Sequence, residues 1–212
     1  MRGAPTSLGP AASGHRRQSR EDAPDGIVSM GGQRSAWPVR VAYVYLAAPT
    51  ALFFAGWLKW YWLVPALAAL GVGLWRMWLA APKVFVPARS RRTVAVGAAV
   101  CLIMAAGTVL SGIGGVSYQH SDHAWRNVIF EMLVVEPWPV VIDSSVGSLP
   151  LTYYFGFWLP AALVGKLGPM AVGWAALLLW TWLCLVIFVG LVRSLLKRFA
   201  VWSSSGRSSP RL

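Results

Sequence analysis

Four long apolar segments, separated by short charged stretches, constrain the fold of this chain more than any other feature. They cover residues 41–58, 61–81, 93–110 and 170–192. A helix needs roughly 20 apolar residues to cross the hydrocarbon core of a bilayer. Because 57% of the chain is hydrophobic and only 12% is charged, we expect an all-α polytopic helical membrane protein with about four transmembrane helices.

The order of the segments predicts how the spans are arranged. Residues 41–81 read as a transmembrane helical hairpin with a tight turn near Lys59, and residues 93–110 and 170–192 as two further spans. Pro49 and Pro65 lie inside the hairpin, where neighbouring helices can satisfy the freed carbonyls. Arg76 is close to the basic loop that follows, so we expect it to snorkel to the interface.

The basic residues predict the sidedness. The net charge is +12, and the Lys and Arg residues cluster in a tail (1–40), a loop (82–92) and a second tail (193–212). Each cluster adjoins an apolar segment, which is the positive-inside pattern. We therefore expect a multi-pass protein of the cell membrane with cytoplasmic N- and C-termini and a disordered N-terminal tail. Anionic lipid headgroups suffice as partners of these charges, and we expect no nucleic-acid partner.

Residues 111–169 form a polar region that is predicted to be extracytoplasmic. It holds four of the seven acids. Residues 122–135 carry apolar side chains at three- and four-residue spacing, which predicts an amphipathic helix on the membrane surface. Residues 143–150 read as a loop. We expect residues 151–167 to lie in the interface or re-enter, because a crossing there would place the last basic cluster outside. The apolar face of the helix comprises Trp125, Val128, Ile129, Met132 and Leu133.

The common fingerprints of soluble enzymes and metal sites are absent from the sequence. There is no CxxC, HExxH, GxxxxGK[ST] or GxSxG motif, so no cofactor is expected. Cys101 and Cys184 lie in apolar segments and read as buried thiols. His120 and His123 flank Asp122, but no fourth ligand is evident, so we expect no metal.

Several short motifs in the polar region resemble those of one membrane protein group. In order, they are SGIGGVSYQHSDHAWRNVIFEMLV, WPV and YYFGFWLPAALVGKLG, and GWLKWYW precedes them in the hairpin. Together they resemble the N-terminal portion of a poorly characterised group of bacterial membrane proteins that is similar to GT-C glycosyltransferases. The resemblance covers roughly residues 41–200.

The resemblance implies a function and a set of site residues. GT-C enzymes use lipid-phosphate-linked sugars and place an acid in their first large external loop, where it activates or orients the acceptor. Asp122 occupies the matching position, with Glu131 as a second acid. Arg126, His123 and Gln119 are the expected substrate-binding residues, and a polyprenyl-phosphate-linked sugar is the expected donor. A purely structural role competes, because Asp122 and Arg126 are four residues apart and can pair on a helix.

The sequence departs from the GT-C pattern in its small number of spans. GT-C proteins have many more, and the later spans complete the donor cavity. The chain is therefore expected to be a partial or truncated GT-C-like enzyme that is inactive alone, or to need a second membrane chain. The ending SSSGRSSPRL fits an out-of-frame terminus, and Met30 is an alternative start. The alternative function is a non-catalytic membrane subunit or scaffold that binds a partner through the external region.

Overall fold

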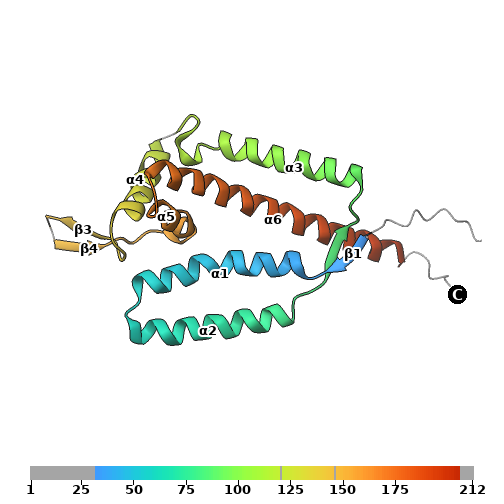
Figure 1. Ribbon diagram of the computed structural model, residues 1–212, viewed down its shortest axis with the longest axis horizontal. Coiled ribbons are helices and arrows are strands. Elements are labelled where there is room, and N and C mark those ends of the chain that lie inside the picture. Colours follow the sequence, from blue (N-terminus) through green and yellow to red (C-terminus); the bar gives the residue numbers. More distant parts are fainter. Residues whose placement is uncertain (1–31, 120, 146, 206–212) are drawn as a thin grey trace, which may run out of the picture. The chain divides into compact units, whose positions relative to one another are not determined.

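The computed structural model describes residues 32–119, 121–145 and 147–205, and the statements below concern these residues. Four helices are long and apolar enough to cross a membrane. The prediction of an all-α polytopic membrane protein is thus confirmed (Figure 1). Residues 1–31 of the tail predicted at 1–40, and residues 206–212 of the tail predicted at 193–212, lie outside the described residues. The four helices are α1 (Trp37–Trp57), α2 (Trp60–Leu79), α3 (Arg91–Leu110) and α6 (Met170–Ser205).

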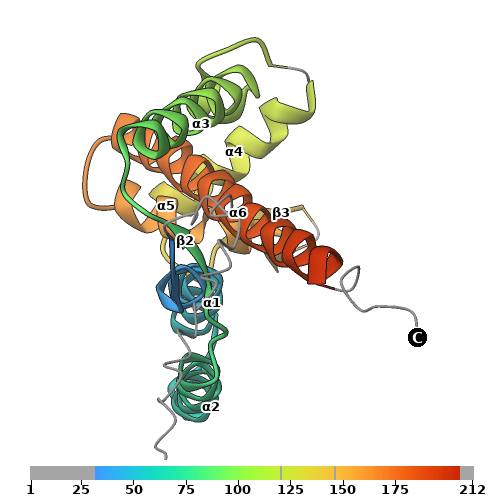
Figure 2. The same ribbon diagram turned by 90° about the vertical axis from the view of Figure 1, so that its right-hand side faces the viewer.

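The four long helices follow one another in the order α2, α1, α6, α3 (Figure 1, Figure 2). Polar contacts between aromatic side chains and backbone carbonyls join them. Tyr45 of α1 stacks on Trp180 of α6 at 4.0 Å and donates its hydroxyl to the Trp180 carbonyl. Trp182 of α6 donates from Nε1 to the Cys101 carbonyl of α3 at 2.9 Å. By contrast, α2 contacts α1 and buries none of its own residues.

Two short strands close the open end of the α1–α2 hairpin. Strand β1 (Gly32–Ser35) pairs antiparallel with β2 (Val84–Pro87), with Ser35 opposite Val84. The prediction that the disordered tail reaches residue 40 is therefore wrong for residues 32–40. Residues 32–35 find backbone partners in β2, and the fixed φ of Pro38 favours the first turn of α1, where it lies. The stretch predicted as a basic loop likewise contains β2 and the start of α3.

Helix α6 continues past the predicted end of its span. The second basic tail was expected to begin at residue 193, but the helix runs to Ser205. Residues 193–197 carry good helix formers, Leu195, Leu196 and Lys197, so nothing in the local sequence ends the helix there. Ser194 also donates from Oγ to the Phe85 carbonyl of β2 at 3.2 Å, which joins this extension to the paired strands.

Residues 111–169, which we call the polar cap, lie at the opposite ends of α3 and α6 from the two strands (Figure 1). The segment predicted as a loop at 143–150 instead belongs to a hairpin, in which Asp143 pairs with Ser148 and Gly147, at φ 121°, begins the second strand directly after the turn. The cap elements are η1 (Ile113–Gly115), α4 (Ser121–Val135), β3 (Val141–Ser144), β4 (Gly147–Pro150), η2 (Phe155–Trp158) and α5 (Leu159–Gly165).

The best-buried core of the described chain lies in the polar cap. Phe130 and Leu133 of α4 and Leu159 of α5 are at most 1% exposed, and they pack with Val140 and with Leu177 of α6. Helix α5 alone rises only about 10 Å, a third of the hydrocarbon thickness, and with η2 it forms the short apolar stretch Phe155–Gly165. The segment 151–167 is therefore not among the helices long enough to cross a membrane, and α5 packs Leu159, Ala161 and Ala162 into the cap core.

Helix α4 is apolar on two faces. The prediction of one membrane-facing stripe is wrong, because Leu133 is fully buried against the cap core together with Phe130 and Val134, which were outside the predicted stripe. Only Trp125 and Val128 of the predicted face are exposed. Packing against α5 and α6 thus buries one apolar side of α4, and a second apolar side has no covering element in the described chain.

Candidate functional site

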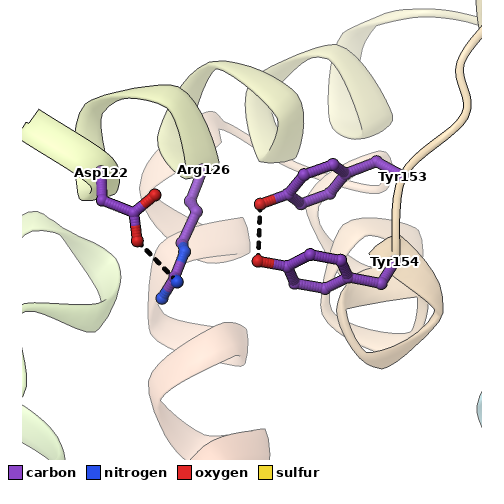
Figure 3. A network of polar contacts seen from close by, with 4 residues as sticks. All are labelled: Asp122, Arg126, Tyr153 and Tyr154. Carbon is purple, nitrogen blue, oxygen red and sulfur yellow. Dashed lines mark hydrogen bonds and ion pairs between the residues drawn. The ribbon is translucent and has the colours of Figure 1, made fainter.

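The first half of α4 presents a charged pair at the edge of the polar cap. Asp122 lies in the first turn, where the helix dipole favours a carboxylate. Its Oδ2 lies 2.6 Å from Nη2 of Arg126, one turn later. The two side chains are 58% and 39% exposed, so the pair is partly solvated. The predicted pairing at i, i+4 is confirmed (Figure 3).

Two stacked tyrosines face the Arg126 guanidinium from the segment before η2. The rings of Tyr153 and Tyr154 lie 4.0 Å apart, and the Tyr153 hydroxyl donates to the Tyr154 hydroxyl at 2.7 Å (Figure 3). That hydrogen bond raises the pKa of Tyr153, while the Arg126 charge acts in the opposite direction. No local pattern predicts this contact, since Arg126 and Tyr153 are far apart along the chain.

Arg126 keeps one donor free of any described partner. Burial lowers the pKa of Arg126, but Asp122 and the two tyrosines outweigh burial and raise it, so the guanidinium is charged at every physiological pH. Its Nε is buried and makes no hydrogen bond to the part of the chain that the structure describes. The side chain as a whole is 39% exposed, so an anionic ligand can approach the accessible part of the guanidinium and make charge-assisted hydrogen bonds with it.

A glycine turn and two amides hold the N-terminal half of α4 in place. Gly112 and Gly114 have φ near 80°, which favours glycine, and a Cβ on Gly114 would lie 3.0 Å from Leu178 of α6. Gln119 donates from Nε2 to the Gly112 carbonyl at 2.7 Å and accepts from Asn127 Nδ2 at 2.9 Å. Both polar ends of Gln119 are thus engaged with the chain, so it positions the turn.

A pocket of about 280 Å³ opens between α4, η1, η2 and the start of α6. Its polar side chains come chiefly from α4 and from Tyr154, whereas aromatic and aliphatic side chains form most of the remaining wall. His123 and Arg126, two of the predicted substrate-binding residues, lie on it, while Asp122 and Gln119 are outside its lining. The lining residues are Ile113, Gly114, His123, Arg126, Asn127, Phe130, Tyr154, Phe157, Trp158, Trp174 and Leu177.

Glu131, the second predicted catalytic acid, does not join this arrangement. Nine residues separate it from Asp122, which is about two and a half helical turns. The two acids therefore project from opposite sides of α4, about 13 Å apart along its axis. Glu131 is exposed and does not line the pocket. The structure does not bring the two acids to one reaction centre.

Sequence reasoning missed nine of the eleven residues that line the pocket, and a signal existed for only some of them. Asn127 is four positions after the predicted site residue His123, so helical spacing predicts that the two share a face. Tyr154 and Trp158 lie in the YYFGFW stretch, whose aromatic content was visible but whose contact with α4 was not. Trp174 of α6 lies on the pocket wall, where its ring is tilted by 43° to the Phe130 ring with the two centroids 4.7 Å apart.

The histidine next to Asp122 does not build a metal site within the described chain. His120 lies outside the described residues, and among those described no group of three or more His, Cys, Asp or Glu could hold a metal ion. His123 instead lies beside the glycine turn, 3.5 Å from the position of a Cβ on Gly112.

Comparisons with known proteins do not assign this arrangement to a family. No family model matches the chain, and neither a curated protein nor a solved structure is significantly similar to it.

Proposed function

We propose that this chain is the membrane portion of a GT-C-like glycosyltransferase whose polar cap binds a lipid-phosphate-linked sugar. The supporting observation is the pocket on α4, where the charged and partly exposed Arg126 lies beside a mostly apolar wall. A ligand that joins an anionic group to a hydrocarbon chain matches both halves of this surface. The resemblance of the cap motifs to GT-C proteins supplies the chemical class.

In this proposal Arg126 contacts the phosphate of the donor. A guanidinium binds phosphate oxygens through charge-assisted hydrogen bonds, which are roughly twice as strong as neutral ones. Asn127 and His123 lie on the same pocket and can add further N–H donors. Phe130, Trp174 and Leu177 provide the apolar wall for the first part of the lipid.

Asp122 would act beside the phosphate rather than within the pocket. One carboxylate oxygen pairs with Arg126, which orients the guanidinium. The side chain is 58% exposed, so its second oxygen is open to an acceptor hydroxyl. A carboxylate within hydrogen-bond reach of that hydroxyl can serve as general base. Glu131 belongs to the other side of α4 and takes no part in this step.

The proposal places the polar cap outside the cell and both tails in the cytoplasm. The cap holds all four carboxylates of the described chain, Asp122, Glu131, Glu136 and Asp143, while Arg40, Lys83, Arg91, Arg193 and Lys197 lie at the other end of the spans. The positive-inside rule then orients the helices. A second membrane chain, or further spans, would complete the donor cavity along the lipid-facing sides.

One observation favours the alternative of a non-catalytic subunit. Trp125, Val128 and Val135 form an exposed apolar stripe on α4, with Trp125 71% exposed. A stripe of this kind on a rigid helix can dock a partner, since exposed apolar patches often mark interaction sites. The two functions make different predictions for lipid binding.

Binding of a polyprenyl monophosphate tests the proposal. The purified chain in neutral detergent is titrated with the phosphorylated lipid and, separately, with the unphosphorylated polyprenol, and bound lipid is counted by native mass spectrometry. We expect preference for the phosphate and at least a tenfold loss of affinity in Arg126→Met. As a control, Lys59→Met also removes one positive charge, but at an exposed position in the turn between α1 and α2, and this variant should bind like the wild type. Equal binding of both lipids would contradict the enzyme and favour the subunit.

A further inference from the structure

A second pocket of about 330 Å³ lies at the basic end of the molecule, between the start of α1, strand β2 and the last turns of the α6 span. Its wall is mostly apolar. Trp37 and Val41 come from α1 and Phe85 from β2, while Leu183 and Gly190 come from α6. It shares no residue with the pocket on α4 and is separate from the proposed function.

The pocket runs along α6 for the length of a lipid chain within one leaflet. From Leu183 to Lys197 the helix rises about 21 Å, and half of a typical hydrocarbon core is about 15 Å. Gly190 lies between these residues, and a Cβ there would have no atom within 4 Å. The missing side chain therefore leaves open space in the middle of the apolar wall.

Two cations, Arg193 and Lys197, line the same pocket at its polar end. They are four residues apart on α6, so they are neighbours on one helix face, and like charges at this spacing repel. The Lys197 Nζ lies 4.1 Å from the centre of the Phe85 ring, which keeps the amine over the pocket wall. All four carboxylates of the described residues belong to the polar cap, so none of them compensates this pair.

The strand pairing fixes the mouth of the pocket. Ser194, between the two cations in sequence, donates to the Phe85 carbonyl at 3.2 Å, and β2 is itself paired with β1. Trp37 is 56% exposed at the first turn of α1, where an amphipathic ring suits the headgroup level of a bilayer. The mouth thus carries a side chain of the kind that membrane proteins place at the level of phospholipid headgroups.

We propose that this pocket binds one anionic phospholipid, with its phosphate between Arg193 and Lys197 and an acyl chain along α6 past Gly190. The anion offsets the repulsion of the two cations, and the chain fills the apolar length. The occupant is a membrane lipid because both the charged mouth and the hydrocarbon-lined length are part of one pocket. Free phosphate would use only the first of these, and a zwitterionic lipid would supply no net charge.

Native mass spectrometry of the chain in neutral detergent tests this site with phosphatidylglycerol and phosphatidylcholine of identical acyl chains. We expect phosphatidylglycerol to be retained preferentially. The double variant Arg193→Gln/Lys197→Gln should weaken it by about thirty-fold, if each cation contributes as basic residues near an anionic surface do. Arg91→Gln/Arg92→Gln removes the same charge at the same end and should have a far smaller effect.

A substitution that leaves the charge unchanged distinguishes binding in this pocket from nonspecific attraction of anionic lipids to the basic end of the protein. Gly190→Leu places a side chain in the open part of the wall and leaves the helix and both cations intact. We expect at least a tenfold loss of phosphatidylglycerol in this variant, and no displacement of the lipid from the wild type by millimolar inorganic phosphate. Equal losses in the two double variants, or unchanged binding in Gly190→Leu, would overturn the proposal.

Discussion

Lys166, directly after α5, donates from Nζ to the Val134 carbonyl of α4 at 3.2 Å, across 32 residues of sequence. The same amine donates to the Glu136 carbonyl and lies 5.4 Å from the centre of the Trp138 ring. A helix leaves its last carbonyls without intrahelical partners, and a cation at that end can satisfy them. One side chain therefore closes α4 and attaches it to α5.

Replacing Lys166 by Met should destabilise the polar cap. The variant keeps the apolar stem but leaves two carbonyls without their donor, so we expect the free energy of unfolding to fall by about 1–2 kcal/mol. Thermal unfolding in detergent, followed by near-ultraviolet circular dichroism, measures the change. Lys59→Met removes an exposed cation and should unfold like the wild type. Equal melting temperatures for both variants would show that the two hydrogen bonds contribute nothing.

The pH dependence of stability should also report on Lys166. Burial lowers the pKa of this amine below its usual value of 10.5, although the Glu136 charge opposes the shift. Between the lowered pKa of the folded state and 10.5, the unfolded chain binds more protons than the folded chain. The contribution of Lys166 to the free energy of unfolding therefore increases as the pH rises through this range. The difference in melting temperature between wild type and Lys166→Met should increase from pH 8 to pH 10. A decrease over this interval would contradict the direction of the shift.

Gly165→Ala should disrupt the contact between α4, α5 and α6. A Cβ at Gly165 would lie 2.9 Å from Val134 and 3.0 Å from the backbone of Gly173. Neither neighbour moves easily. The β-branched side chain of Val134 is restricted in χ1, and the atom of Gly173 that the new Cβ would contact is its backbone Cα. We expect a loss of about 1–3 kcal/mol, measured by thermal unfolding in detergent. Gly97→Ala on α3 has open space around it and should be neutral or slightly stabilising.

Asp122→Asn should leave membrane insertion intact and change stability little. Partly exposed ion pairs contribute about 1 kcal/mol or less, because solvent screens them. Membrane extraction with carbonate followed by a melting curve checks both points. If the variant failed to insert or lost several kcal/mol, Asp122 would be a structural residue. A near-normal melting curve allows any loss of ligand binding or transfer to be assigned to the site.

Impermeant thiol labelling in intact cells tests the sidedness. In a background with Cys101 and Cys184 replaced by Ala, we expect Ser145→Cys in the cap hairpin to be labelled and Ala88→Cys beside β2 to be protected. Both positions are exposed in the structure, so access depends on the membrane side. The reverse pattern would invert the topology and place the proposed phospholipid site in the outer leaflet.

Local features of the sequence were sufficient to predict the long helices and the Asp122–Arg126 pair. The thickness of the hydrocarbon core sets how many consecutive apolar residues a spanning helix needs, so such helices can be recognised from composition. Helical spacing alone places residues four apart side by side. The same spacing also places Glu131 half a turn beyond two turns from Asp122, so the helical period by itself puts the two acids on opposite sides of α4.

Contacts between distant segments could not be predicted in this way. Strand β1 pairs with a strand about 50 residues later, and neither Gly32–Ser35 nor Val84–Pro87 carries a strong strand pattern by itself. The tyrosines that face Arg126 come from beyond the cap hairpin. Such pairings depend on how α4, α5 and α6 pack, and packing is not encoded in any single window of residues.

The Tyr45–Trp180 contact sets an order for assembly during synthesis. The two residues are 135 positions apart, and at roughly 5–20 residues per second the ribosome needs about 7–27 s to make the intervening chain. Throughout that interval the Tyr45 hydroxyl of α1 lacks its carbonyl acceptor on α6. Helix α1 is thus complete well before the helix that supplies the hydrogen-bond acceptor of Tyr45.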